Sequence, residues 1–170
     1  IIFTSNLGMY VKDALGQRHQ NVSYDMPYDE VTRRLREAIG DYFKLELGRP
    51  EILNRIGENI VIFDFIRQEA GQAILRAQVD KLIRRLKDQK NLTLVIPDTS
   101  YQQLSDAALA DLTNGGRGIG NQVEALLINP LSRYLFDSGI AENATVTVDA
   151  FETTAQPPAL RCTTTKEENT

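Results

Sequence analysis

Short apolar runs typical of buried strands alternate in this sequence with longer segments of helical periodicity. The runs are Ile1–Phe3, Asn59–Phe65, Leu92–Ile96 and Thr145–Val148. Between the second and the third lies Arg67–Gln89, where apolar residues recur at intervals of three and four, as on one face of a helix. Strands that alternate with helices are typical of the α/β class. We therefore expect an α/β part before Ile66 and a helical, mixed subdomain after it.

Cap and breaker residues mark the ends of the other predicted helices. Asp29 is suited to cap a helix over Asp29–Leu47, and Gly48 is suited to stop it. Asp98 or Thr99 is suited to start the helix that follows the third strand. The remaining helices are expected over Glu51–Arg55, Ser100–Thr113 and Ile119–Phe136.

Two further features complete the expected organisation. Pro130 lies inside the last helix and removes one backbone donor, which predicts a kink rather than a break. From Thr153 onward the chain is rich in Thr, Pro and Glu, which predicts a flexible tail. Residues 9–28 are expected to form a loop. The expected domains are residues 1–66, 67–150 and the tail 151–170.

The composition is that of a soluble globular protein and excludes several functional classes. Apolar residues make up 42% of the 170 and charged residues 25%, so a core can form and the chain is not disordered. No run of 18 apolar residues is present, which argues against a membrane span. The net charge of −4 argues against a nucleic-acid partner. One cysteine and one histidine cannot form an internal disulfide or a Cys/His zinc site, so we expect a cytoplasmic protein without a metal centre of its own.

The glycine cluster Gly115–Gly120 has the Gly-x4-Gly spacing of a phosphate-binding loop. Asn121 and Gln122 stand where that loop requires Lys and then Ser or Thr, so the loop cation and the Mg²⁺ ligand are both missing. The cluster also lacks the spacing of a dinucleotide-binding turn and follows no predicted strand. By itself it indicates a flexible turn between helices.

Two other segments carry side chains suited to nucleotide chemistry. Asn6 follows the first apolar run, and an amide at the carboxyl end of a strand can orient a nucleotide or a water, although Asn also forms turns. Arg55 ends a predicted helix, where it either caps carbonyl groups or is presented across a subunit interface. His19 has no partner at catalytic spacing, and Cys162 lies in the expected tail. A stand-alone enzyme built on either residue is therefore disfavoured.

Taken in order, these signals resemble the Clp-type AAA+ unfoldases and disaggregases. The segment IIFTSNLG at residues 1–8 looks like the sensor-1 strand of that family, and RPEILNRI at residues 49–56 is similar to the segment that carries its arginine finger. Gly116-Arg117, followed by a helix that contains Asn129-Pro130-Leu131, resembles its sensor-2 helix. The resemblance covers residues 1–150. It implies the C-terminal remnant of a parallel AAA+ sheet in a large α/β subdomain, followed by a small α+β helical lid subdomain.

The resemblance implies a role in ATP hydrolysis for three side chains. Asn6 would be sensor 1 and would hold the attacking water beside the γ-phosphate. Arg55 would be the arginine finger, donated to the nucleotide of a neighbouring subunit. Arg117 would be sensor 2, which reaches the γ-phosphate from the lid of its own subunit. Asn6 and Arg117 would thus bind the nucleotide, and both guanidinium groups would neutralise charge that develops during phosphoryl transfer.

The same resemblance implies which parts of the machinery lie elsewhere. The Walker A and Walker B motifs, which hold ATP and Mg²⁺, belong before sensor 1, so the isolated chain is expected to be inactive. The parent protein would form a ring, by resemblance a hexamer, and would act on protein substrates. A peptidase or an adaptor is a further candidate partner.

Three departures from the family pattern leave a second interpretation open. The family usually has Asp where Gly57 stands, often has Pro where Gly118 stands, and has a Tyr-containing turn in place of Leu112–Gly115. The second interpretation is a degenerate AAA+-like adaptor or oligomerisation module without hydrolysis. In either case the first two apolar runs would flank a strand of the missing half, so each is expected to have an unpaired edge. Residues 68–150 are then expected to be the better packed part.

Overall fold

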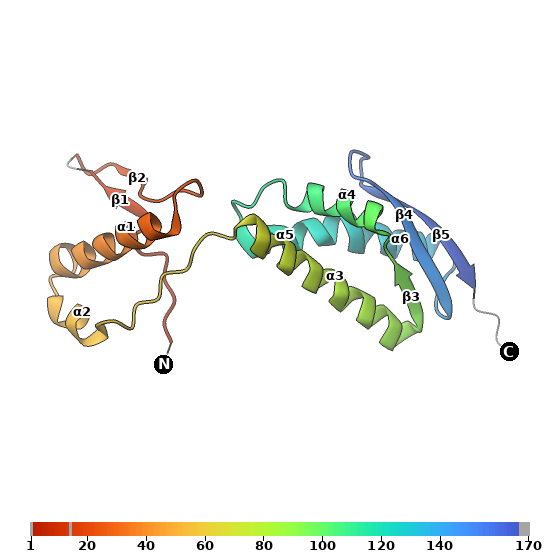
Figure 1. The fold of residues 1–170 in the computed structure, drawn as a ribbon, viewed down its shortest axis with the longest axis horizontal. Helices are drawn as coiled ribbons and strands as arrows, with labels where there is room; N and C mark the ends of the chain where they lie inside the picture. Colours follow the sequence, from red (N-terminus) through yellow and green to blue (C-terminus); the bar gives the residue numbers. More distant parts are fainter. Residues whose placement is uncertain (1, 14, 167–170) are drawn as a thin grey trace. The chain divides into compact units, whose positions relative to one another are not determined.

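A computed structural model describes residues 2–13 and 15–166 (Figure 1). The chain folds into two compact units, unit 1 up to Phe65 and unit 2 from Ile66 onward. Of the buried apolar side chains in the described residues, only Val22, Val31 and Leu35 belong to unit 1. The larger core therefore lies in unit 2, and the prediction that residues 68–150 are the better packed part is confirmed.

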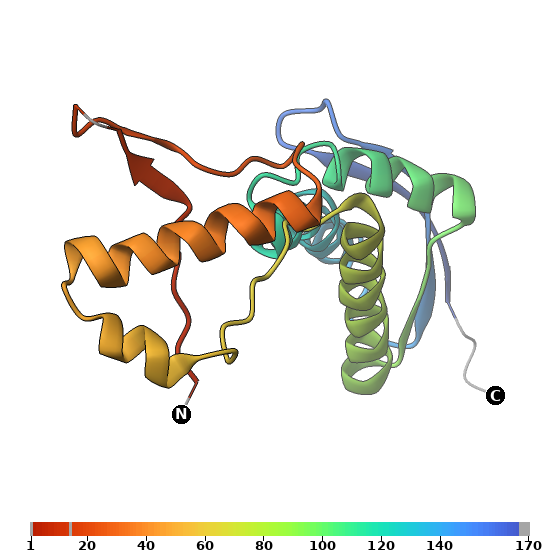
Figure 2. The same cartoon turned by 60° about the vertical axis from the view of Figure 1, so that its left-hand side comes forward.

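Unit 1 is built around the helix α1 (Tyr28–Asp41). Strands β1 (Tyr10–Lys12) and β2 (Arg18–Gln20) pair as an antiparallel hairpin, and the π-turn η1 (Tyr42–Glu46) leads into the short helix α2 (Pro50–Ile56). Figures 1 and 2 show the hairpin and α2 on opposite sides of α1. The core of the unit consists of buried and half-buried apolar side chains, which are Met9, Val22, Met26, Val31, Leu35, Ile62 and Phe65.

The hairpin replaces the loop that was expected over residues 9–28. Its tip is organised by Asp13, whose carboxylate accepts hydrogen bonds from the backbone N–H groups of Leu15 and Gln17, each at 2.9 Å. Each strand has three residues, and only Val11 among them is partly buried. Because so few residues alternate between the two faces, the periodicity that identifies a strand is absent from the sequence.

The first two predicted strands are not formed, which corrects the sequence interpretation. Ile1 lies outside the described residues. Residues 2–6 and 59–67 have no regular secondary structure. Ile2 and Phe3 are 92% and 87% exposed, and Val61 and Phe63 are 73% and 83% exposed. A strand needs a neighbour for its backbone N–H and C=O groups, and within the described residues neither run has one.

Helix α1 starts one residue earlier than predicted, and Asp29 does not cap it. The carbonyl of Pro27 accepts the N–H groups of Glu30 and Val31 at 3.0 Å each, and no side chain caps the helix. Asp29 instead lies in the first turn, where its negative charge faces the positive end of the helix dipole. The helix predicted from Ser100 likewise begins earlier, directly after Pro97.

In its described residues, unit 2 combines four α-helices with a three-stranded sheet (Figure 2). The helices are α3 (Gln68–Lys90), α4 (Asp98–Ala108), α5 (Gly115–Val123) and α6 (Asn129–Asp137), and the strands are β3 (Leu92–Val95), β4 (Ala144–Glu152) and β5 (Ala159–Lys166). In the order β3-β4-β5, the first pair is parallel and the second antiparallel. The most deeply buried large side chains come from all layers and include Leu75, Leu92, Leu104, Ile119, Leu127, Val146 and Val148. A stretch of apolar helix long enough to cross a bilayer is absent from the described part of the chain.

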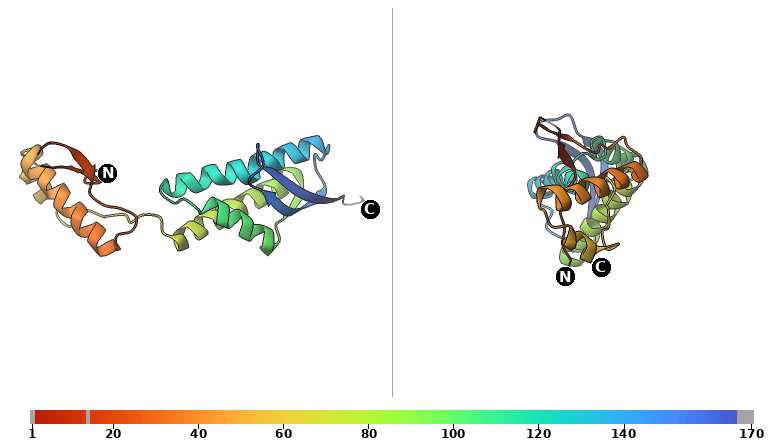
Figure 3. Two further views of the ribbon diagram at one scale, coloured as in Figure 1. Left: turned by 90° about the horizontal axis from the view of Figure 1, so that it is seen from above. Right: turned by 90° about the vertical axis from the view of Figure 1, so that its left-hand side faces the viewer.

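The predicted helix through Pro130 is present, with a π-turn in place of the expected kink. Helices α5 and α6 are joined by the π-turn η2 (Glu124–Ile128), and Figure 3 shows the three as one continuous rod. Proline lacks an N–H group and its ring clashes with the carbonyl four residues earlier. A wider turn directly before Pro130 relieves both conflicts without ending the helix.

Residues 159–166, expected to belong to a flexible tail, form the edge strand β5. The strand pairs with the full length of β4, with a bulge beside Asp149. The Tyr134 hydroxyl of α6 donates to the Cys162 carbonyl (3.3 Å) and shares a hydrogen bond with the Thr164 hydroxyl (2.8 Å). The segment has few large apolar side chains, so its order depends on backbone pairing and on these hydrogen bonds rather than on burial.

We predict that Tyr134→Phe lowers the free energy of unfolding by about 1 kcal/mol, because the two hydrogen bonds to β5 are lost while the ring is kept. Urea titration followed by circular dichroism measures the change. Phe136→Ala on the same helix is the control, since Phe136 is 86% exposed, and it should change stability by less than about 0.5 kcal/mol. Equal losses in the two variants would contradict this role of Tyr134.

Candidate functional site

Asn6 lies at the start of a tight turn that precedes β1. Its carbonyl accepts a hydrogen bond from the N–H of Met9 (3.3 Å), and the Ser5 hydroxyl accepts one from the N–H of Leu7 (3.0 Å). The Asn6 side chain is exposed and has no hydrogen-bond partner among the described residues. Its amide is therefore free to donate to, or accept from, a group outside this chain.

Arg55 lies in the last turn of α2, and the chain before this helix fixes where the helix starts. The N–H of Arg49 donates to the Phe43 carbonyl (2.7 Å), which closes the reversal between η1 and α2. Pro50 then occupies the first position of α2, where its missing N–H is not needed. The Arg55 side chain is exposed.

Arg55 differs from the other arginines of unit 1 in having no partner among the described residues. The others are Arg33, Arg34 and Arg49, which face carboxylates, Arg36, which donates to the Ile60 carbonyl, and Arg18, which lies over the Tyr10 ring. An unpaired guanidinium has all five N–H donors available for an anion. This property is what a phosphate-binding arginine requires.

The end of α2 depends on Gly57. Its N–H donates to the Leu53 carbonyl (2.9 Å), and the N–H of Asn59 donates to the Ile56 carbonyl (3.1 Å), so Gly57 is the first central residue of a turn. With φ +55° and ψ −132° it has the conformation of a type II′ turn, which strongly favours glycine. Glycine in place of the family's Asp is therefore a requirement of this turn.

Arg117 is exposed in the first turn of α5 and has no partner among the described residues. Ile119, two positions later, is completely buried and holds this end of the helix in the core of unit 2. The glycine cluster thus forms the beginning of a helix, and the interpretation of it as a flexible turn is wrong. It remains without the Lys and hydroxyl that a phosphate-binding loop needs.

The structure assigns the candidate residues to different units. Asn6 and Arg55 belong to unit 1 and Arg117 to unit 2, and no hydrogen bond within the described residues joins Asn6 to Arg55. His19 is exposed in β2 opposite Val11. Asn6, Arg55 and Arg117 are thus exposed polar groups without internal partners among the described residues, which is compatible with a ligand that other residues hold.

Sequence reasoning missed a hollow of about 470 Å³ in unit 1. The hairpin contributes Tyr10, Lys12 and Arg18 to its lining, and the end of α1 with η1 contributes Asp41, Tyr42 and Glu46. The two sides therefore carry opposite charges. These residues become neighbours only when the hairpin forms. In the sequence, Asp13 was a signal for the hairpin turn, because an Asp side chain can accept hydrogen bonds from the backbone N–H groups of a turn.

Comparison with known proteins connects these features. Residues 66–148 match the C-terminal D2-small domain of the ClpB protein. The chaperone protein ClpB of Gloeobacter violaceus is 31% identical over 149 residues, which cover 88% of this chain and 16% of the relative. The chain corresponds to the C-terminal part of a Clp-type AAA+ chaperone. The predicted α/β class with a small AAA+ lid subdomain is confirmed, whereas the expected remnant of a parallel AAA+ sheet before the lid is not formed in the described residues.

Other Clp relatives match over the same extent. ClpB of Rhizobium meliloti is 30% identical over 150 residues, covering 88% of this chain and 16% of that protein. The ATP-dependent Clp protease ATP-binding subunit ClpC of Staphylococcus epidermidis is 26% identical over 150 residues, with 88% and 17% covered. The chain thus spans about one sixth of the length of these relatives. Unit 2 carries the D2-small match, and unit 1 lies before it.

We predict opposite effects of the same substitution at two glycines of unit 1. Gly57→Ala should lower the free energy of unfolding by roughly 1–2 kcal/mol, because an L-residue is strained at this positive φ. Gly40→Ala, within α1 and with no atom within 4 Å of the added Cβ, should raise it by roughly 0.5–1 kcal/mol. Urea titrations of the two variants measure both signs, and a stabilising Gly57→Ala would contradict the turn.

We predict that the Cys162 thiol reacts slowly in the folded chain. Burial, together with the nearby Asp149 carboxylate, raises the pKa of Cys162 to about 11. At pH 8 alkylation should therefore be roughly 100-fold slower than in the chain unfolded in urea, because the thiolate is the nucleophile. The neutral thiol stabilises the fold most below its usual pKa, and this contribution is lost as the pH rises toward 11. Equal alkylation rates would contradict the raised pKa.

Proposed function

We propose that this chain supplies sensor 1, the arginine finger and sensor 2 to the ATPase site of a Clp-type AAA+ protein. The observation that carries the proposal is that three polar side chains at the motif positions are exposed and unpaired among the described residues. Asn6, Arg55 and Arg117 occur in the family's order, and each is exposed without a partner among the described residues. Polar groups left free at motif positions are what a phosphate and its attacking water would use.

Each group has a separate chemical task in this proposal. The Asn6 amide orients the water that attacks the γ-phosphate. Arg55 reaches the nucleotide of the neighbouring subunit, and Arg117 reaches that of its own subunit from the lid. An arginine finger is worth about 10³–10⁵ in turnover, so Arg55 would contribute most to the rate.

The phosphates of ATP and the Mg²⁺ ion would be held mainly by residues outside this chain. The glycine cluster lacks the residues of a phosphate-binding loop, and the described residues contain no group of three or more His, Cys, Asp or Glu side chains suited to a metal. In this proposal the Mg²⁺ ligands belong to the Walker motifs outside this chain, and the isolated chain hydrolyses no ATP.

The exposed apolar runs of unit 1 support the proposal that a strand outside this chain completes the AAA+ sheet. Phe3 and Phe63 are both more than four-fifths exposed in segments that the sequence predicts as buried strands. In the proposed parent a central strand would pair with these segments and bury them. The parent would be a cytoplasmic ring, a hexamer by family likeness, that remodels protein substrates, with a peptidase or an adaptor as a further partner.

A second candidate function is an adaptor or oligomerisation module without hydrolysis. The turn at Gly57 favours it, because this turn replaces the family's usual acidic residue two positions after Arg55. The two candidate functions differ in one measurable effect. If Arg55 is a catalytic arginine finger, its loss lowers the ATPase rate of the neighbouring subunit, and in an adaptor without hydrolysis it does not.

The test is a mixing experiment with the natural-length protein that carries this chain. Arg55→Ala subunits mixed with wild type should lower the ATPase rate below the value expected for simple dilution, because each variant subunit disables its neighbour's site. Arg33→Ala, an exposed arginine of α1, is the matched control and should leave the rate unchanged.

Two outcomes would contradict the proposal. If the ATPase rate falls only in proportion to the wild-type fraction, Arg55 does not act on a neighbouring subunit. If the wild type has no ATPase activity, the adaptor function is favoured. For the isolated chain, a steady ATPase rate abolished by Arg117→Ala would contradict the expected inactivity.

A further inference from the structure

The turn that carries Asn6 is pressed against α1 at Gly8. Gly8 is buried with φ +87°, and a Cβ added there would lie 3.2 Å from the Cβ of Ala38 and 3.3 Å from Cδ2 of Leu35. Such distances are tighter than nine in ten natural Cβ contacts, so the neighbouring side chains would have to shift. The backbone two residues after Asn6 is thus in direct contact with the helix, and only glycine fits without displacing it.

Asn21 ties this turn to both the helix and the hairpin. Its side-chain amide donates to the Gly8 carbonyl (2.9 Å) and to the Arg34 carbonyl of α1 (3.3 Å). Its backbone N–H donates to the Met9 carbonyl (3.0 Å). One residue therefore holds two consecutive peptide groups of the turn, and both donors of its amide are used.

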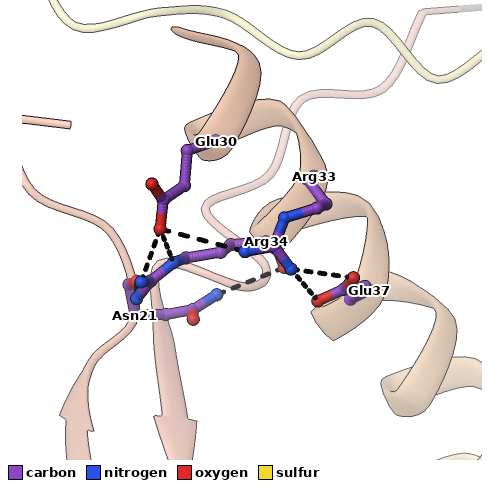
Figure 4. A network of polar contacts seen from close by, with 5 residues as sticks. All are labelled: Asn21, Glu30, Arg33, Arg34 and Glu37. Atoms are coloured by element: carbon purple, nitrogen blue, oxygen red, sulfur yellow. Dashed lines mark hydrogen bonds and ion pairs between the residues drawn. The ribbon is translucent and has the colours of Figure 1, made fainter. Parts of the chain in front are cut away.

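Arg34 completes the connection from the other side (Figure 4). Its guanidinium donates to the Asn21 carbonyl (3.1 Å) and pairs with Glu30, at 2.9 Å from Nε and 2.6 Å from the terminal nitrogen. The Arg34 and Glu30 side chains are 37% and 38% exposed, whereas the adjacent pair Arg33–Glu37 is 58% and 61% exposed. We call Asn21, Arg34 and Glu30 the clamp. Its charge-assisted bonds are partly shielded from water, which strengthens them relative to the outer pair.

The clamp holds the end of the turn that Asn6 begins. The N–H of Met9 donates to the Asn6 carbonyl, and the Met9 carbonyl accepts from Asn21. The Asn6 side chain has no partner of its own among the described residues, so within this part of the chain only its backbone is held. Whatever fixes residues 8 and 9 against α1 therefore also restrains the backbone from which the Asn6 side chain extends.

We propose that Asn21 and Arg34 are positioning residues that hold Asn6 in the geometry needed to orient a water. The proposal rests on the proposed function of Asn6. A group that orients a reactant must be held within about 0.5 Å, and a misplacement of about 1 Å costs on the order of 10²-fold in rate. We assign this restraint of the backbone next to Asn6 to the hydrogen bonds from Asn21 to the Gly8 and Met9 carbonyls, which Arg34 supports through the Asn21 carbonyl.

The test is a mutant cycle in the natural-length protein, with ATPase kinetics as the readout. Asn21→Asp keeps the shape of the side chain and removes the donors to Gly8 and Arg34. Arg34→Gln removes the charge and serves as a second variant should Asn21→Asp fail to fold. Arg33→Gln, the same substitution one residue earlier, is the matched control, because Arg33 pairs at 3.1 Å with Glu37, outside the clamp, and only at 3.8 Å with Glu30. Thermal denaturation and ring assembly are measured for each variant.

We expect Asn21→Asp and Arg34→Gln to lower kcat about 10- to 100-fold and to change the KM for ATP less than about 3-fold. In an Asn6→Ala background the same substitutions should cause no further loss of kcat, because the group they position is gone. Arg33→Gln should leave kcat unchanged in both backgrounds. A general loss of folding would lower the activity in both backgrounds alike.

Two kinds of result overturn the inference and separate it from the proposed function. If Asn6→Ala lowers kcat but the clamp variants have no effect, or have the same effect in both backgrounds, the clamp does not act through Asn6. If Asn6→Ala leaves kcat unchanged, or the wild type has no ATPase activity, the proposed role of Asn6 fails and the positioning role fails with it.

Discussion

Strand pairing decides which apolar runs of this chain become ordered. β4 has a neighbour on each side, parallel β3 and antiparallel β5, and its inward side chains Val146 and Val148 are buried. The runs at residues 2–3 and 60–63 are more apolar than β5, yet they lack a neighbouring strand among the described residues, and Phe3 and Phe63 are exposed. Backbone groups must be paired before a side chain can be buried in a sheet, so apolar character alone does not form a strand.

The same constraint explains the different character of the two units. Unit 2 contains its own sheet and closes a core around it, and this part matches the ClpB D2-small domain. Unit 1 has a small core on one face of α1 and leaves Phe3 and Phe63 in solvent. Helix α1 is the scaffold of unit 1. Asn21 connects the turn of Asn6 to it by hydrogen bonds, and the reversal at η1 carries the chain from it to the helix of Arg55.

The long helices could be predicted from the sequence because many residues share one period. α3 and the rod from α5 to α6 follow from repeated apolar spacing, and even Pro130 was correctly placed inside a helix. The hairpin and β5 could not be predicted in this way. Their strands are short or polar, and their stability comes from partners far along the chain, such as Tyr134 for β5.

For the candidate site, too, some features follow from the sequence and others only from the tertiary structure. The motifs around Asn6, Arg55 and Arg117, and the family they indicate, are properties of residue order and spacing, so the sequence by itself determined them. Only the tertiary structure decided that Asn21 and Arg34 hold the turn of Asn6 and that Gly57 must adopt a conformation that Asp would find strained. The reason is physical: a motif records which chemical group is present, whereas contacts between residues 13 or more positions apart determine how firmly that group is held.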